Sequence, residues 1–174
     1  GEYKIIGTIR WNREGGLNSF YIPDKKRLEI FRNISDFVDI IDVELKSKIC
    51  SNVVEICKSK NKKIILSYHN FKKTPDIKML KKLIKKSRKN GANIVKIATK
   101  VKNEKHLFTL LDLTYQYSKK LDLVVIPMGV SIYERLIPII FGSIFTYVSI
   151  NKRTAPSQPT YYEVSKFIDI IKEN

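Results

Sequence analysis

Short runs of β-branched residues alternate with longer helical patterns along the whole chain. The candidate strands are residues 3–10, 38–45, 62–69, 93–99, 122–128 and 144–150. The candidate helices are residues 24–35, 47–60, 76–90, 103–119, 131–142 and 160–173. The run Thr74-Pro75-Asp76 and the pair Asn103 and Glu104 are plausible N-terminal caps of the third and fourth of them. One strand followed by one helix, repeated, predicts an α/β fold. The near-continuous Ile and Val of the strands indicate a parallel sheet that is buried on both faces.

Ionisable residues at the ends of successive strands favour a barrel over an open doubly wound sheet. Arg10, Glu44, His69 and Lys96 each stand at or near the carboxyl end of one of the first four candidate strands. An open sheet usually places its site in one crevice, whereas a barrel collects residues from many strand ends. We therefore expect a (β/α)8 TIM-barrel type of fold. Residues 1–174 should form a single barrel domain with about six βα units, because no linker or low-complexity stretch divides them.

The net charge of +16 raises the question of a nucleic-acid partner. Many lysines lie in runs such as residues 81–89, which a solvated helix face explains equally well, and no nucleic-acid-binding motif is present. We therefore expect no nucleic-acid partner. No apolar run approaches the roughly 20 residues that span a bilayer, so no membrane partner is expected either.

The two cysteines, Cys50 and Cys57, lie two helical turns apart, roughly 10 Å, which is too far for a disulfide. A reducing, cytoplasmic location is the natural interpretation. No Cys/His cluster has metal-ligand spacing, and we expect no metal and no cofactor.

Lys96 is unusual because it stands inside the apolar segment NIVKIAT, on the same strand face as Ile94 and Ala98. Burial would lower the pKa of this amine, and a neutral amine can attack a ketone to form an imine. A lysine at a strand end can also extend its amine to solvent. The segment alone leaves both alternatives open.

Other polar residues could serve the same site. His69 ends the run IILSYH and would suit proton transfer, although a structural histidine is an equal alternative. Glu14 precedes two glycines, which indicates a tight turn, and Arg10 could bind a carboxylate or hydroxyls. Arg135, after the fifth strand, suits a substrate carboxylate, and Gln158 in a loop could contact a hydroxyl. Each of these residues could instead be an ordinary solvated side chain.

Taken together, these segments resemble the type I 3-dehydroquinate dehydratase family from its third barrel strand to its C-terminus. The resemblance is carried by IRWNREGG, DIIDVEL, SYHNFKKTP, NIVKIAT and FGSIFTYVSINKRTAPSQ. It implies a lyase of the shikimate pathway, in aromatic amino acid biosynthesis, that converts 3-dehydroquinate to 3-dehydroshikimate and water. A homodimer is possible.

The resemblance also implies roles for particular residues. Lys96 would form a Schiff base with the substrate ketone, His69 would transfer the proton, and Glu14 would orient His69. The residues implied in substrate binding are Arg10, Arg135, Gln158, Thr154, Glu44 and Met128.

The chain departs from the family pattern in two places. The first two βα units of the family's barrel have no counterpart, which suggests a chain truncated at its N-terminus. The segment MGVSIYER, which ends at Arg135, is one residue shorter than the family's and lacks its second glycine and its serine.

Two other functions fit part of the pattern. A Schiff-base aldolase on the same type of barrel would share the strand-end lysine. An inactive basic barrel fragment that binds polyanions would account for the charge and for the missing units.

Overall fold

The computed structural model describes residues 3–15, 21–151, 153 and 157–172 of the chain. Its strands are β1 (Ile6–Thr8), β2 (Ile40–Glu44), β3 (Lys63–Asn70), β4 (Ile94–Lys100) and β5 (Asp122–Met128). Its α-helices are α1 (Asp24–Ile34), α2 (Cys50–Ser59), α3 (Ile77–Lys89), α4 (Glu104–Ser118), α5 (Ile132–Ile140) and α6 (Tyr161–Lys172). A 3₁₀ turn, η1 (Asn12–Glu14), follows β1.

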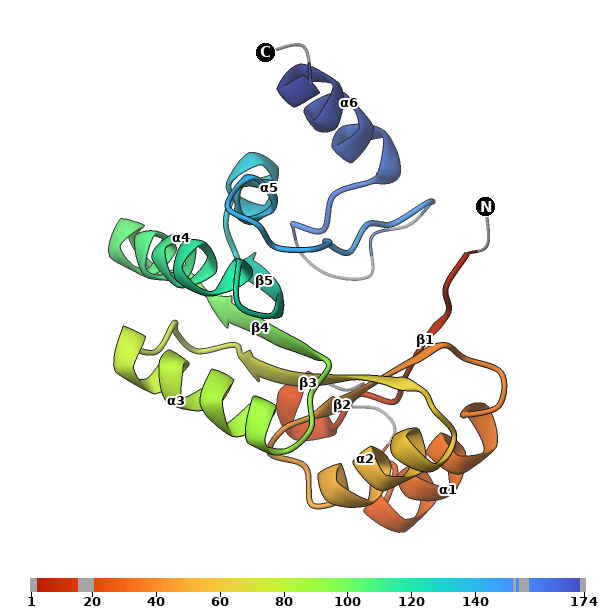
Figure 1. Cartoon of the computed structure of the whole chain (residues 1–174). Coiled ribbons are helices and arrows are strands. Elements are labelled where there is room, and N and C mark those ends of the chain that lie inside the picture. The colour runs from red at the N-terminus through yellow and green to blue at the C-terminus, as the bar shows by residue number, and fades with distance from the viewer. Residues whose placement is uncertain (1–2, 16–20, 152, 154–156, 173–174) are drawn as a thin grey trace.

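The five strands form one parallel sheet in the order β1-β2-β3-β4-β5. Because strand order follows chain order, every crossover runs in the same direction around the sheet, as in a barrel wall and unlike a doubly wound sheet. Figure 1 shows α1, α2 and α3 on one side of this sheet, while the chain that follows α5 runs over the other side. The described strands therefore form an arc of a TIM-barrel wall, as the sequence predicted.

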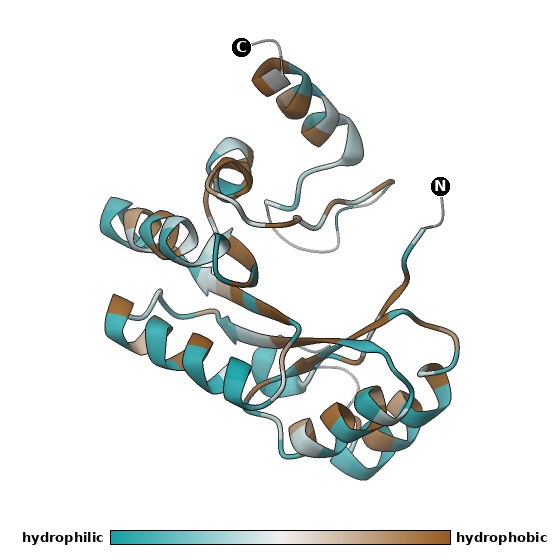
Figure 2. Cartoon of the chain, viewed as in Figure 1, coloured by the Kyte–Doolittle hydropathy of each residue, from teal (hydrophilic) through white to brown (hydrophobic). Residues whose placement is uncertain are grey.

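The two faces of the sheet pack against different parts of the chain. The outer face carries alternate residues such as Val43, Leu66 and Val95 and buries them beneath the helices in the larger hydrophobic core. The inner face carries a smaller apolar cluster of Ile40, Ile65, Ile94, Ala98, Val124 and Ile126. Figure 2 shows the matching pattern, with hydrophobic strands and a mostly hydrophilic α3.

The inner face receives its cover from the segment after α5. Phe145 and Tyr147 of that segment pack on the inner apolar cluster, with their rings edge to face at 5.6 Å between centroids. This cover protects one end of the inner face and leaves the polar residues of the strands grouped around it.

The prediction of a sixth strand over residues 144–150 is wrong. Among the described residues, this segment forms no strand, and the β-type pairing that it makes is an isolated parallel bridge between Ser149 and Thr160. Of the six expected strands, the described part of the chain thus contains five.

A side-chain hydroxyl explains why no sixth strand continues along β5. The amide of Val125 donates to the hydroxyl of Ser143 at 3.0 Å, so a side chain occupies the position that a backbone carbonyl of the next strand would take. The backbone then makes one more bond, from Ile144 N to Leu123 O at 3.0 Å. The alternation of apolar residues in 144–150 therefore reflects burial against the inner face of the sheet and not pairing with a neighbouring strand.

The first strand is also shorter than residues 3–10. β1 pairs with β2 only from Ile6 to Thr8, and Arg10 lies beyond the strand rather than at its end. The predicted helices agree with the structure within a few residues at each end. Asp76 and Asn103 are the N-caps of α3 and α4, as expected, and each side chain accepts a bond from a backbone amide in its helix.

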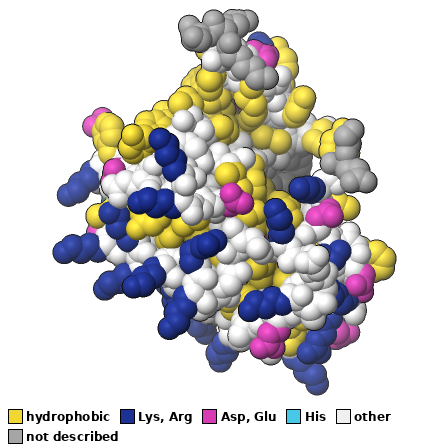
Figure 3. Space-filling view, viewed as in Figure 1, with side chains coloured by type: hydrophobic (Ala, Val, Ile, Leu, Met, Phe, Trp, Pro, Cys, Tyr) yellow, Lys and Arg dark blue, Asp and Glu magenta, His cyan; other side chains and the backbone are white. Residues whose placement is uncertain are grey.

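Charged and apolar side chains are segregated on the surface. In the view of Figure 3, lysine and arginine side chains gather over the α3 side, and hydrophobic side chains gather towards α6. Cys50 and Cys57 are both free and buried. No helix within the described residues is long and apolar enough to cross a bilayer.

Candidate active site

A cavity of about 440 Å³ opens at the carboxyl ends of the strands, where barrel enzymes place their sites. It is lined by Thr8, Arg10, Gly15, His69, Phe71, Lys96, Ala98, Ile126, Met128, Arg135, Tyr147 and Gln158. The structure therefore brings together residues that are up to 150 positions apart in the chain.

Lys96 reaches this cavity from the middle of β4. It lies in register with Ser67 of β3, and its side chain is 6% exposed. Its Nζ atom is 2.9 Å from Oδ2 of Asp42 and 4.1 Å from the centre of the Tyr147 ring. Burial lowers the pKa of Lys96, although the carboxylate of Asp42 acts in the opposite direction. The amine is therefore held inside the barrel wall and is not at its surface.

Asp42 is the residue that the sequence reasoning missed. Its carboxylate binds Lys96 on one side and Arg10 on the other, through Arg10 Nη2 at 2.9 Å and Nη1 at 3.3 Å. Against the effect of burial, these two cations hold its pKa well below the ordinary value. The signal was available, because strand alternation places Asp42 on the same face of β2 as Glu44.

Glu14 and His69 form a second buried pair. Oε2 of Glu14 accepts a bond from the backbone amide of His69 at 2.8 Å and lies 3.2 Å from its Nδ1. Burial raises the pKa of Glu14 to about 7. Burial, with the nearby positive charges of Arg10 and Lys96, lowers the pKa of His69 to about 2. His69 is thus neutral near pH 7, and Glu14 can hold its Nδ1 proton so that Nε2 is the basic atom.

The glycine after Glu14 permits this arrangement. Gly15 ends the turn η1 with a φ of 93°, a conformation that favours glycine. A Cβ atom at this position would lie 2.5 Å from the ring of Phe71. The turn therefore needs glycine for both its backbone and its close approach to β3. Gly16, the second glycine of the motif, lies outside the described residues.

Glu44, which the sequence analysis placed among the substrate-binding residues, does not line the cavity. Its side chain is fully buried. One oxygen accepts bonds from Arg10 and the Trp11 amide, and the other accepts from Arg27. Glu44 thus holds other residues in position from behind the cavity wall.

The structure describes three of the four remaining residues that the sequence analysis assigned to the site. Arg135 on α5 is buried and lines the cavity, and its Nε atom has no hydrogen-bond partner among the described residues. A capping box between Ser131 and Glu134 fixes the start of α5, just before this arginine. Gln158 and Met128 also line the cavity. Thr154 lies outside the described residues.

The arrangement suits covalent catalysis on an anionic, oxygen-rich molecule. It combines a buried amine, a neutral histidine with a carboxylate behind it, and two arginines at the cavity wall. Within the described residues, no group of three or more His, Cys, Asp or Glu side chains is arranged to hold a metal ion.

Comparison with known proteins gives one consistent result. The profile of the family described as type I 3-dehydroquinase matches residues 2–174. The 3-dehydroquinate dehydratase of Pyrococcus abyssi is 36% identical over 98% of this chain and 77% of its own length. That of Thermodesulfovibrio yellowstonii is 35% identical over 88% of this chain and 66% of its own length. The chain thus spans about two thirds to three quarters of these relatives.

Solved structures agree with the sequence comparisons. The 3-dehydroquinate dehydratase of Geobacillus kaustophilus superposes with a TM-score of 0.90 at 26% identity, covering 98% of this chain and 68% of that protein. The type I enzyme of Clostridium difficile, solved with covalent modified comenic acid, gives a TM-score of 0.86 at 29% identity and covers 97% and 68%. The chain belongs to the type I 3-dehydroquinase family.

Proposed function

We propose that this chain carries the dehydratase chemistry of its family and converts 3-dehydroquinate to 3-dehydroshikimate and water. The observation that carries the proposal is the Lys96 amine, which is buried inside the wall, has a lowered pKa and faces a cavity that it shares with His69. The buried carboxylate beside it, Asp42, can stabilise positive charge on the nitrogen as the amine changes charge.

Lys96 acts as the nucleophile in the proposed sequence of steps. Its neutral amine adds to the C3 ketone, and loss of water gives an imine that accepts electrons from the adjacent C2–H bond. Cleavage of that bond gives an enamine, whose electrons then expel the C1 hydroxyl. Hydrolysis of the product imine restores the amine, so the net reaction releases one water.

His69 moves the protons between these steps. Its Nε2 atom takes the C2 proton and then donates a proton to the departing C1 hydroxyl, which leaves as water. Glu14 supports both steps because it holds the Nδ1 proton of His69. This role requires Glu14 to be ionised at the moment when His69 acts as a base.

Arginines bind the polar groups of the substrate. Arg135 has an Nε atom without a hydrogen-bond partner in the described part of the chain, and a forked, permanently charged group, and both favour the substrate carboxylate. Arg10 also lines the cavity and contacts substrate oxygens, and Gln158 contacts a hydroxyl. Thr154 would join them as a further contact to the substrate, and Met128 supplies an apolar part of the cavity wall.

The direct test follows the conjugated product by its ultraviolet absorbance after 3-dehydroquinate is added. The Lys96→Ala variant should fold normally and show no turnover. Lys100→Ala is the matched control, because Lys100 lies on the same strand but does not line the cavity, and it should keep wild-type turnover. Wild-type turnover in Lys96→Ala would refute the mechanism.

The other functions give different outcomes in the same experiments. A Schiff-base aldolase would leave 3-dehydroquinate unchanged and would cleave aldehyde-forming sugar phosphates instead. A basic fragment that binds polyanions would be inactive towards both and would bind nucleic acid in a salt-sensitive way. We expect neither outcome, and we expect the protein to work in the cytoplasm.

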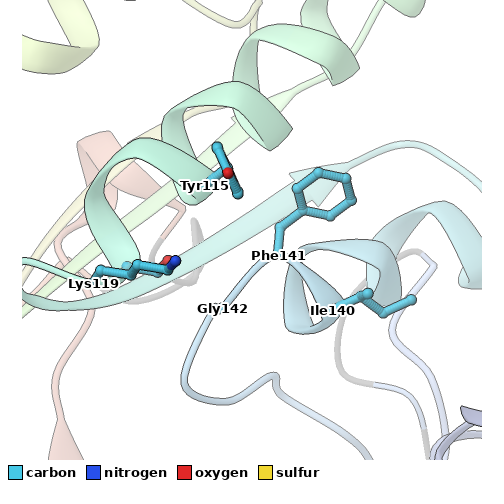
Figure 4. Close-up of a pocket in the computed structure, with 6 residues that line it drawn as sticks. Tyr115, Lys119, Ile140, Phe141 and Gly142 are labelled. Carbon is cyan, nitrogen blue, oxygen red and sulfur yellow. The ribbon is translucent and has the colours of Figure 1, made fainter.

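We also propose that the chain self-associates as a homodimer. A groove at the ends of α4 and α5 supports this, because Tyr115, Ile140 and Phe141 leave large apolar side chains exposed there. Figure 4 shows Tyr115 of α4 and Lys119, just after α4, on one side of this groove, and Ile140 and Phe141 at the end of α5 on the other. Exposed apolar side chains in one patch are typical of protein contact surfaces.

A further inference from the structure

An arginine behind the cavity wall makes an unusual number of contacts. Arg27 lies on α1 and its side chain is 0% exposed. Its Nη2 donates to Oε2 of Glu44 at 2.6 Å and to the carbonyl of Ile9 at 2.9 Å. Its Nη1 donates to the hydroxyl of Ser47 at 3.0 Å and to Asp24 at 3.2 Å. Arg27 does not line the cavity.

Arg27 reaches the cavity through Glu44. The oxygen of Glu44 that does not bind Arg27 accepts a bond from Nη1 of Arg10 at 3.0 Å and one from the Trp11 amide at 2.7 Å. Arg27 therefore fixes both the carboxylate that binds Arg10 and, through the Ile9 carbonyl, the backbone from which Arg10 extends. No other described residue holds Glu44 and this backbone together from the helix side.

The chain of contacts continues to the Schiff-base lysine. Arg10 shares its guanidinium between Glu44 and Asp42, and Asp42 binds Lys96 at 2.9 Å. From Arg27 inwards, each charge is paired with one of opposite sign: arginine, glutamate, arginine, aspartate, lysine. Buried ion pairs add little stability compared with apolar side chains of similar size. This series of five charged side chains therefore favours a role in fixing the geometry of the site over a role in stabilising the fold.

We propose that Arg27 is a positioning residue for the dehydratase: through Glu44 it holds Arg10 in the orientation that pairs Arg10 with Asp42 beside Lys96. The inference rests on the proposed function only for its effect on turnover. Its effect on the reactivity of Lys96 does not depend on which substrate the protein uses.

Without the guanidinium of Arg27, Glu44 has Arg10 as its remaining cation. Arg10 should then move towards Glu44 and loosen its longest bond, the 3.3 Å contact with Asp42. A displacement of about 1 Å in a substrate-contacting group can lower catalytic efficiency by about 100-fold.

The reactivity of Lys96 should change in a defined direction. The charged or titratable groups around Lys96 are Asp42 and Glu44 from β2, Arg10 after β1, His69 from β3 and Tyr147 after α5, and Arg135 lines the same cavity. Glu44 raises the pKa of Lys96 and Arg10 lowers it. Removing the charge of Arg27 leaves Glu44 less neutralised and draws Arg10 away, and both changes raise the pKa of Lys96.

The test uses Arg27→Met, which keeps much of the volume, and Arg27→Lys, which keeps the charge and can still reach Glu44 but cannot make all the other contacts. Arg32→Met on the exposed face of α1 is the matched control. Near-ultraviolet circular dichroism reports folding. Steady-state kinetics give kcat and KM, and an amine-reactive acylating reagent with peptide mass spectrometry gives the pH midpoint of Lys96 labelling.

We expect folded Arg27→Met to lose about 100-fold in kcat/KM and to label Lys96 with a midpoint at higher pH. Arg27→Lys should fall between it and the wild type, and Arg32→Met should match the wild type. An unchanged labelling midpoint in a folded Arg27→Met protein would overturn the inference. If Arg27→Met does not fold, an unchanged midpoint and kcat/KM in Arg27→Lys would do the same. A wild-type protein that fails to dehydrate 3-dehydroquinate contradicts the proposed function instead, and the labelling result still decides the role of Arg27.

Discussion

Lys96 and His69 are both buried, but different neighbours adjust them. Burial lowers the pKa of Lys96, and the carboxylate of Asp42 acts in the opposite direction. Burial, with the positive charges of Arg10 and Lys96, lowers the pKa of His69, which stays neutral near pH 7. In the proposed mechanism Lys96 is the nucleophile and His69 the base, and the neighbours that adjust the two residues come from other parts of the chain.

The pH dependence of turnover should follow the protonation state of Glu14. Its pKa of about 7 in the folded protein means that Glu14 loses its proton as the pH rises through 7, and only then accepts the Nδ1 proton of His69. We expect an acid limb in kcat/KM near pH 7 that Glu14→Gln removes, together with a drop in rate of about 100-fold or more. A Glu14→Gln variant with the same acid limb would assign that limb to another group.

The effect of Glu14 on protein stability should change with pH in the opposite direction to its effect on turnover. The pKa of Glu14 is raised on folding, so its contribution to stability is fully present below pH 4.5 and is lost as the pH rises through about 7. Urea unfolding at pH 5 and pH 8 should therefore differ less in Glu14→Gln than in the wild type.

Local sequence identified some site residues and missed others for a physical reason. Lys96 stands out because its neighbours are apolar, and His69 because it ends an apolar run. Arg27 stands in the charged segment DKKRLE and looks like a surface residue, since its burial comes from contacts with Glu44 and Ser47 that are far away in sequence. Asp42 was available from strand alternation but gave no local sign of its two cationic partners.

At the scale of elements, the alternation of strands and helices predicted the parallel sheet and the six α-helices well. It failed at residues 144–150, where apolar alternation resembles a strand but the backbone does not pair. Periodicity reports which face of a segment is buried, and it cannot distinguish burial under a neighbouring strand from burial across the inner face of a sheet. Ser143 distinguishes the two cases here, because its hydroxyl accepts the hydrogen bond of the Val125 amide in β5.

Replacing that hydroxyl should destabilise the end of the sheet. In Ser143→Ala the buried amide of Val125 loses its acceptor, which should lower the free energy of unfolding by about 1–3 kcal/mol. Urea denaturation measures the change. Ser51→Ala, on the exposed side of α2, is the control and should stay within about 0.5 kcal/mol of the wild type. Equal stability of the two variants would mean that Ser143 does not hold this edge.

At the scale of the whole molecule, the described strands form an arc that brings four strand ends to one cavity. Its inner face is covered in part by the segment after α5, and its outer face by the helices. Figure 3 shows many lysine and arginine side chains on the surface of one side of the molecule, whereas Arg10 and Lys96 in the cavity are paired with Asp42. We expect this surface charge to favour solubility.

The proposed homodimer involves the whole molecule. If the groove between α4 and α5 is the contact between two copies, Ile140→Lys should convert a dimer to a monomer without loss of secondary structure. Sedimentation velocity at several concentrations measures the change, and Ile150→Lys, an exposed apolar residue outside the groove, is the control. A wild-type protein that is monomeric at all concentrations would rule out the dimer.

The most direct measurement is reduction with borohydride in the presence of 3-dehydroquinate, followed by peptide mass spectrometry. An imine between Lys96 and a ring ketone would be reduced to a stable secondary amine. We predict one adduct, located on Lys96 and absent from Lys96→Ala. Turnover of 3-dehydroquinate without any adduct, or an adduct on a different lysine, would contradict the account.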